Sequence, residues 1–194
     1  MNSKSKPFLA VVLATTIAVT GCTAQWINVA LQDLPVLTQM ALNIATLVSA
    51  LATGQQASTA DVALVQNISA QASRDLNLLQ ALYKEYKASA NAATLQKIQN
   101  VISDLNQNLP ALLESAHISN PTVSARITAA VNLILTTVNS FASLIPQTSM
   151  PTAAKAPTTP LVRAKDLKKQ WNQQVCAPTG NPAIDASFAA SVLR

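Results

Sequence analysis

The chain has 194 residues, of which 49% are hydrophobic, 4% aromatic and only 11% charged, so its length fits one domain with appendages. Alanine and leucine are abundant and only three glycines occur, which favours helices over sheets. The formal net charge of +5 includes two lysines of the first seven residues, and it is too small to indicate a nucleic-acid partner.

The first 21 residues have the pattern of an export signal. Residues 1–7 contain Lys4 and Lys6 without an acidic residue, and residues 8–19 are apolar or small. A positive segment followed by about 7 to 15 apolar residues is typical of a signal peptide, whereas a membrane-spanning helix needs about 20. We therefore expect residues 1–21 to be a signal peptide and not a permanent anchor.

The apolar run ends in Val19-Thr20-Gly21-Cys22. These four residues resemble the lipobox of bacterial lipoproteins, although Leu is commoner at the first position and Ala or Ser at the second. The resemblance covers residues 1–22 only. It implies cleavage between Gly21 and Cys22 and a lipid attached to the Cys22 sulfur, because a cysteine side chain can accept a lipid as a thioether.

A lipidated Cys22 would make the membrane the first partner of this protein. By the sorting rule known for many lipoproteins of two-membrane bacteria, Thr23 after the cysteine implies the outer membrane, with the periplasmic face as the expected side. The alternatives are an ordinary signal peptide with a chance cysteine and an uncleaved N-terminal helix.

Between the signal and Pro146, apolar residues recur every three or four positions in four stretches, which is the pattern of bundle helices. The stretches lie at about 26–53, 59–88, 95–116 and 121–145. Helices of about 25 residues joined by short turns favour antiparallel neighbours. We therefore predict an all-α fold in which residues 22–146 form an up-down four-helix bundle, about 35–40 Å long.

Several residues predict where these helices begin or bend. Ser58 with Asp61 is typical of a helix start, as is Asn120-Pro121. Pro35 predicts either a kink in the first helix or a true start near Asp33. The third helix has the most regular heptad and contains a proline late in its length; its apolar positions are Leu95, Ile98, Ile102, Leu105, Leu109, Leu112 and Ala116.

After the fourth helix the composition changes. Residues 147–162 are rich in Pro and Thr and are predicted to form an extended linker. Residues 163–194 are predicted to form a basic, irregular and partly helical tail. Within it, a short basic helix is expected over 163–175, followed by a break at 178–182 and a last apolar stretch.

The short basic helix supplies a candidate surface contact. Its members are Arg163, Lys165, Lys168, Lys169 and Trp171. Cations and Trp favour an anionic membrane surface or another polyanion. The alternative interpretation, which we favour, is a solvated helix with Trp171 folded back on the bundle.

Few residues suggest chemistry. Glu114 and His117 have the Glu-x-x-His spacing of di-iron bundles, but such sites need a second pair and the chain has only one other glutamate, so we expect no metal. Tyr83 and Tyr86 suggest either a binding face or, as we favour, core positions. If Cys22 is lipidated, Cys176 is left to form an intermolecular disulfide or to stay buried and inert.

The sequence therefore predicts no enzyme and no cofactor. It indicates a membrane-anchored envelope lipoprotein whose helical bundle is a structural or interaction module, with an envelope protein as a candidate partner. One alternative is a carrier that binds an apolar ligand or lipid between helices separated at Pro35 and Pro110. Another is an enzyme whose site is completed by a partner.

Overall fold

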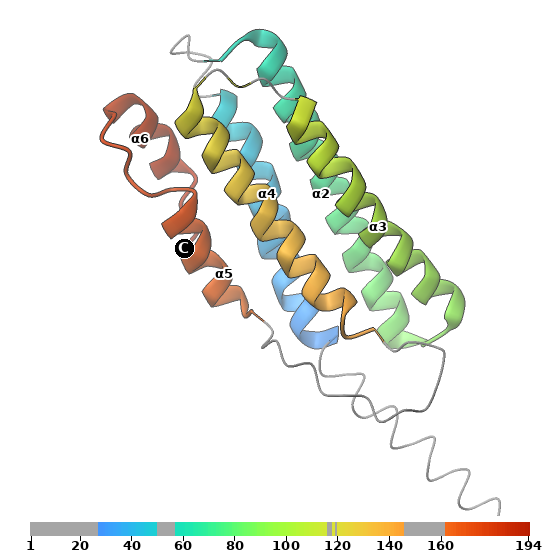
Figure 1. Ribbon diagram of the computed structural model, residues 1–194. Coiled ribbons are helices and arrows are strands. Elements are labelled where there is room, and N and C mark those ends of the chain that lie inside the picture. Colours follow the sequence, from blue (N-terminus) through green and yellow to red (C-terminus); the bar gives the residue numbers. More distant parts are fainter. Residues whose placement is uncertain (1–26, 50–56, 116–117, 119, 146–161) are drawn as a thin grey trace, which may run out of the picture.

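A computed structural model of the chain is shown in Figure 1. The residues that it describes are 27–49, 57–115, 118, 120–145 and 162–194. They form helices joined by turns and contain no strand, so the predicted all-α fold is confirmed. The predicted signal peptide, Cys22 and all of the predicted linker except Val162 lie outside the described residues.

Four long helices form the bundle. They are the N-terminal helix, which is helical over residues 27–49, and α2 (Thr59–Ala88), α3 (Ala92–Ser115) and α4 (Pro121–Ala142). Their direction alternates from one to the next along the chain, as the colour sequence in Figure 1 shows. The up-down order expected from the short connections is therefore present.

The two predicted helix starts are confirmed by their hydrogen bonds. The Ser58 hydroxyl accepts from the Asp61 N–H at 3.1 Å, and the Asp61 carboxylate accepts from the Ser58 N–H at 3.4 Å. The Asn120 side chain accepts from the N–H groups of Thr122 and Val123 at 3.0 and 3.2 Å. These contacts satisfy donors that the first turn of a helix otherwise leaves unpaired.

Pro35 and Pro110 do not interrupt the helices that contain them. The N-terminal helix is already helical at residue 27, so the predicted alternative start near Asp33 is wrong. Ile27 and Ala30, before the proline, are as buried as Leu34 beside it. Their burial offsets the backbone hydrogen bond that Pro35 removes. Pro110 likewise lies inside α3.

α4 ends at Ala142, four residues before Pro146. The chain leaves the helix by a tight turn, in which the Leu144 N–H donates to the Phe141 carbonyl at 3.0 Å and the Ile145 N–H donates to the Ala142 carbonyl at 3.2 Å. This turn buries the Ile145 side chain at the end of the core.

The apolar stripes of the four helices meet in one core. In α3 the predicted heptad positions Leu95, Ile98, Ile102, Leu105 and Leu109 are buried, and Leu112 is half-buried. The last predicted position, Ala116, lies outside the described residues. The heptad therefore faces the interior, as its spacing predicts.

Two polar contacts tie neighbouring helices together at fixed positions. The buried Ser69 hydroxyl of α2 donates to the Ala41 carbonyl of the N-terminal helix at 2.6 Å. Asn106 of α3 and Asn139 of α4 exchange side-chain hydrogen bonds at 2.8 and 2.9 Å. Because each contact needs one alignment of two helices, the pair of contacts helps to fix the register.

The C-terminal tail forms two helices, α5 (Ala164–Gln174) and α6 (Pro182–Ala190). α5 lies beside α4, and the chain then turns back through α6 (Figure 1). The predicted basic helix is thus confirmed to within a residue at each end. The tail also joins the core of the bundle through its buried side chains, which are Leu167, Trp171, Val175, Ile184 and Phe188.

We expect Leu105→Asp to destabilise the fold by about 3 kcal/mol or more, because Leu105 is fully buried and an unpaired carboxylate there loses its hydration. Gln107→Asp, at an exposed position of the same helix, should change stability by no more than about 0.5 kcal/mol. Urea melts of the two variants, made without the signal and Cys22, provide the comparison. Equal melts of Leu105→Asp and the wild type would contradict the packed core.

Candidate functional site

The predicted lipidation site is placed only by its distance along the chain. Gly21 and Cys22 lie outside the described residues, which begin at residue 27. Cys22 precedes the described part of the N-terminal helix by five positions in the sequence, and that helix begins at the lower end of the bundle in Figure 1.

Trp171 is an interior residue. It is fully buried, and its indole N–H donates to the Ser191 carbonyl at 2.9 Å. The prediction of a surface contact is therefore wrong for Trp171, and the interpretation in which it folds back on the bundle is confirmed. The physical reason is that the ring has a large apolar area to bury and a single polar atom that finds a partner in α6's last turn.

The four predicted basic residues have different surroundings. Arg163, Lys165 and Lys169 are exposed on α5, whereas Lys168 is half-buried and its Nζ donates to the Arg194 carbonyl at 2.6 Å. Lys165 and Lys169 are one turn apart and share a face of the helix. Lys168 is therefore held by its hydrogen bond to Arg194, whereas the side chains of the other three cations are exposed to solvent.

Asp33 holds the first turn of α5. Its side chain is almost fully buried and accepts a hydrogen bond from the Ala164 N–H, the first residue of that helix. The residue before it, Arg163, provides no side-chain cap. The other carboxylate oxygen, Oδ2, is buried without a hydrogen-bond partner among the described residues. Burial raises the pKa of Asp33 from 3.8 to about 6, although the Ala164 N–H acts in the opposite direction.

Arg126 of α4 holds the other end of α5. Its Nη1 donates to the Gln174 carbonyl at 2.5 Å and its Nη2 to the Ala177 carbonyl at 3.3 Å. A helix has a partial positive charge at its N-terminus and a partial negative charge at its C-terminus. α5 therefore has a carboxyl group at its positive end and a guanidinium at its negative end, both supplied by the bundle.

Asp185 organises the connection between α5 and α6. Its carboxylate accepts hydrogen bonds from the Thr179 hydroxyl and N–H at 2.7 Å each and from the Gly180 N–H at 3.2 Å. The bonds from Thr179 hold the pKa of Asp185 below its usual range. Gly180 has a positive φ of 81°, which a side chain would strain. This carboxylate has a structural role.

Cys176 follows α5 directly and is half-buried, and it is a free cysteine within the described part of the chain. Burial raises the pKa of its thiol, with smaller effects from Trp171 and Arg126 in the opposite direction. A raised thiol pKa lowers the fraction of reactive thiolate. The intermolecular disulfide stays a prediction.

Tyr83 and Tyr86 are both buried, so the interpretation as core residues is confirmed. Burial raises the pKa of the Tyr83 phenol. Lys84 and Lys87, which lie between and after them in α2, are exposed. The binding-face hypothesis therefore does not hold for the two tyrosines.

His117 lies outside the described residues, so the Glu114–His117 geometry stays untested. In the described ranges, no three His, Cys, Asp or Glu side chains are grouped so as to hold a metal ion. The same part of the chain has no helix that combines the length and the hydropathy of a membrane span.

Arg126 and Asp185 have no sequence signal that predicts their roles, and Asp33 is predicted from the sequence only as a possible helix start. Their partners lie 48 or more residues away for Arg126 and more than 100 residues away for Asp33. The sequence offers one signal for Asp33, which is its position beside Leu34 in the apolar stripe of the first helix. A carboxyl group on that face is expected to be buried. No sequence rule identifies its partner.

Comparisons of the chain with protein-family models, with curated proteins and with solved structures found no match.

The raised pKa of Asp33 predicts a pH-dependent stability. The folded state binds this proton more tightly than the unfolded state, so the contribution is fully present below pH 3.8 and is lost as pH rises through about 6. Asp33→Asn keeps an acceptor for the Ala164 N–H and cannot ionise. We expect it to raise stability at pH 7 by about 1 kcal/mol and to flatten the loss between pH 4 and 6.

Urea melts across this pH range measure the effect of Asp33→Asn. Asp104→Asn is the matched control, since it removes the same charge at an exposed position of α3. A wild-type stability that stays flat between pH 4 and 6, or a control variant that behaves like Asp33→Asn, would contradict the role of the buried carboxyl.

Arg126→Ala should weaken the docking of α5 because it removes two hydrogen bonds from a charged donor to the helix C-terminus. The expected cost is about 1 to 2 kcal/mol. Trp171 fluorescence during urea unfolding, with Trp26 replaced by Phe, reports the exposure of α5 directly. Arg74→Ala removes a cation whose hydrogen bond to Gln71 stays within α2, and it should leave the midpoint nearly unchanged.

Proposed function

We propose that this protein is a lipid-anchored lipoprotein of the bacterial envelope, and that its helical bundle is a non-enzymatic structural or interaction module. The observation that carries the proposal is the order of residues 1–22: two lysines, an apolar run of signal-peptide length, and Gly21-Cys22 at its end. A cysteine at that point is the acceptor that lipidation requires.

The anchoring chemistry explains why one cysteine is sufficient. Each acyl methylene that enters the bilayer contributes about 0.8 kcal/mol, and a single short chain binds only marginally. Two or three chains on Cys22 hold the protein on the membrane almost permanently. Thr23 directs the anchored protein to the outer membrane in a two-membrane cell, and the bundle then lies in the periplasm.

The use of polar side chains within the bundle supports a structural or interaction role. Asp33, Arg126 and Asp185 all bond to backbone groups at the ends of α5 and α6 or in the loop between them. Their bonds stabilise the tail on the bundle. A protein partner in the envelope is the expected target of such a module.

Cys22→Ser should abolish membrane retention, because it removes the acyl acceptor. The test is fractionation of cells after a carbonate wash, together with incorporation of labelled palmitate. Cys176→Ser is the matched control: it removes the other cysteine of the chain and should keep both the label and the membrane fraction. A Cys22→Ser protein that stays on the membrane and still takes up palmitate would refute the proposal.

A further inference from the structure

The exposed charges of the described chain are distributed unevenly along the bundle. One end is formed by the start of the N-terminal helix, the α2–α3 turn and the end of α4, and we name it the basic end (Figure 1). Three cations are exposed within about 8 Å of it along their helices. They are Lys84, Lys87 and Lys97.

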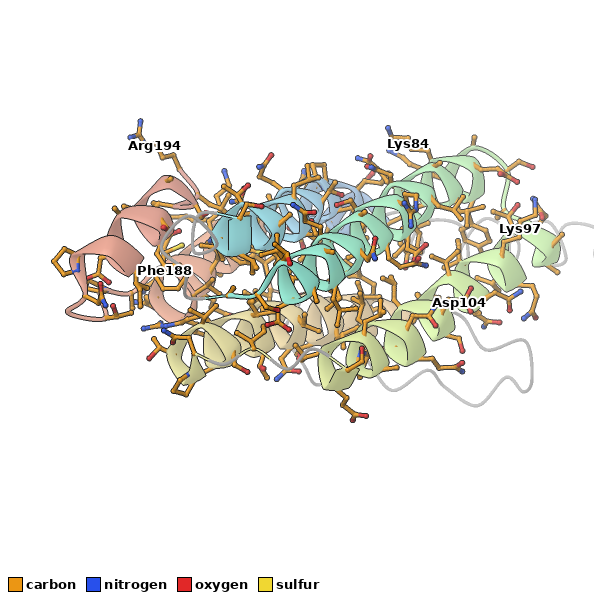
Figure 2. All side chains as sticks on the ribbon, turned by 90° about the horizontal axis from the view of Figure 1, so that it is seen from above. Lys84, Lys97, Asp104, Phe188 and Arg194 are labelled. Atoms are coloured by element: carbon orange, nitrogen blue, oxygen red, sulfur yellow. The ribbon has the colours of Figure 1, made fainter. Side chains whose placement is uncertain are left out.

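Anionic groups are fewer at the basic end. Glu85 is the exposed one. Three cations against one exposed anion give this end a net charge of +2 among the described residues. In Figure 2, Lys84 and Lys97 lie in the opposite half of the view from Phe188 of α6.

The opposite end has the opposite sign. Asp61 at the start of α2, Glu114 at the end of α3 and Asp185 in α6 give three anions, and Arg126 is the cation there. The net charge of this end is −2 among the described residues. The remaining charged residues of the described ranges lie further along the helices from both ends, and Arg194 lies beside Lys168 of α5. They are Asp33, Arg74, Asp75, Asp104, Arg163, Lys165, Asp166, Lys168, Lys169 and Arg194.

The basic end is also the end next to the proposed anchor. The N-terminal helix begins there, and Cys22 precedes residue 27 by five positions in the sequence. The antiparallel contact between Ser69 and Ala41 places the end of α2, with Lys84 and Lys87, at the level of residue 27. The hydrogen bond from Ala164 to Asp33 places the start of α5 about 9 Å further along the bundle, because Asp33 follows residue 27 by six residues.

We propose that the bundle stands with its basic end on an anionic phospholipid surface, and that Lys84, Lys87 and Lys97 contact the lipid headgroups. This proposal rests on the proposed lipidation of Cys22, which holds that end near the bilayer. Charges further than about one Debye length, roughly 8 Å in physiological salt, are largely screened from the surface. The cations of the basic end are therefore the ones that decide the orientation, and the anionic end points away from the membrane.

This orientation leaves α6 and the starts of α2 and α4 furthest from the lipid. The contact surface also differs from the one predicted from the sequence, which included Lys168, Lys169 and Trp171. It instead consists of three cations of the α2–α3 hairpin, more than 60 residues earlier in the chain.

The test uses the full chain, produced and lipidated in bacteria, with Cys176→Ser. A donor fluorophore is attached to a cysteine at Ala90, in the α2–α3 turn, or at Ala60, near the start of α2; both positions are exposed. The two positions are separated by the length of α2, about 45 Å. The proteins are placed in phosphatidylcholine vesicles with and without phosphatidylglycerol, with an acceptor dye on the lipid headgroups.

We expect strong energy transfer from position 90 and weak transfer from position 60 in the anionic vesicles, and a smaller difference in high salt or in neutral vesicles. The double variant Lys87→Gln/Lys97→Gln should lower the population of molecules that stand with the basic end on the membrane, by about fivefold for each lysine removed. Arg74→Gln with Lys169→Gln removes the same two charges in mid-bundle and should leave the transfer unchanged.

Equal transfer from the two positions would overturn the proposal, as would a control pair that acts like Lys87→Gln with Lys97→Gln. A strong signal at position 90 that ignores salt and lipid charge would also overturn it, since the tether alone would then set the orientation. Failure of the lipid anchor is distinguishable: a protein without acyl chains does not associate with the neutral vesicles at all.

Discussion

Each helix of this protein has one apolar stripe, and the burial of these stripes against one another is the interaction on which the rest of the structure depends. Only 11% of the residues are charged, so ion pairs contribute little to the fold. A buried Leu, Ile or Val side chain contributes about 1.5 to 3 kcal/mol, and the core extends from Ile27 to Phe188. The four long helices and the tail therefore share one interior.

Polar contacts have a different role, because they select among the ways in which such stripes can pack. Apolar surfaces tolerate sliding, whereas the Asn106–Asn139 pair and the Ser69–Ala41 bond each require one alignment. α5 depends most on such contacts, since it is short and has only a few core residues. Asp33 and Arg126 fix its two ends and match the direction of its dipole. A reversed α5 would place each charge at the wrong end.

Because charged residues are scarce in this chain, their positions on the bundle are informative. In a chain with many ions, an excess of two cations at one end would mean little; here that end has three of the eight exposed cations of the described residues. The proposed anchor precedes the N-terminal helix in the sequence, and this helix begins at the basic end, so a lipid tether and surface charge act in the same direction. The part of the bundle available to a protein partner is then the sides and the anionic end.

Residues close together in the chain determined much of this protein from the sequence alone. The all-α fold class follows from the local spacing of apolar residues, and the Ser58 and Asn120 caps follow from backbone donors one turn away. The heptad of α3 and the interior positions of Tyr83 and Tyr86 in α2 follow from the apolar spacing within each helix. The lipobox resemblance is equally local. The tertiary structure decided what depends on residues distant in sequence: the continuation of the N-terminal helix before Pro35, the burial of Trp171, the capping of α5 by Asp33 and Arg126, and the position of Lys84, Lys87 and Lys97 at the end where the N-terminal helix begins. The periodicity of a sequence shows which face of a helix is apolar. Which helix packs against that face is decided only when all the helices pack together, and the positions of the charges in space depend on that packing.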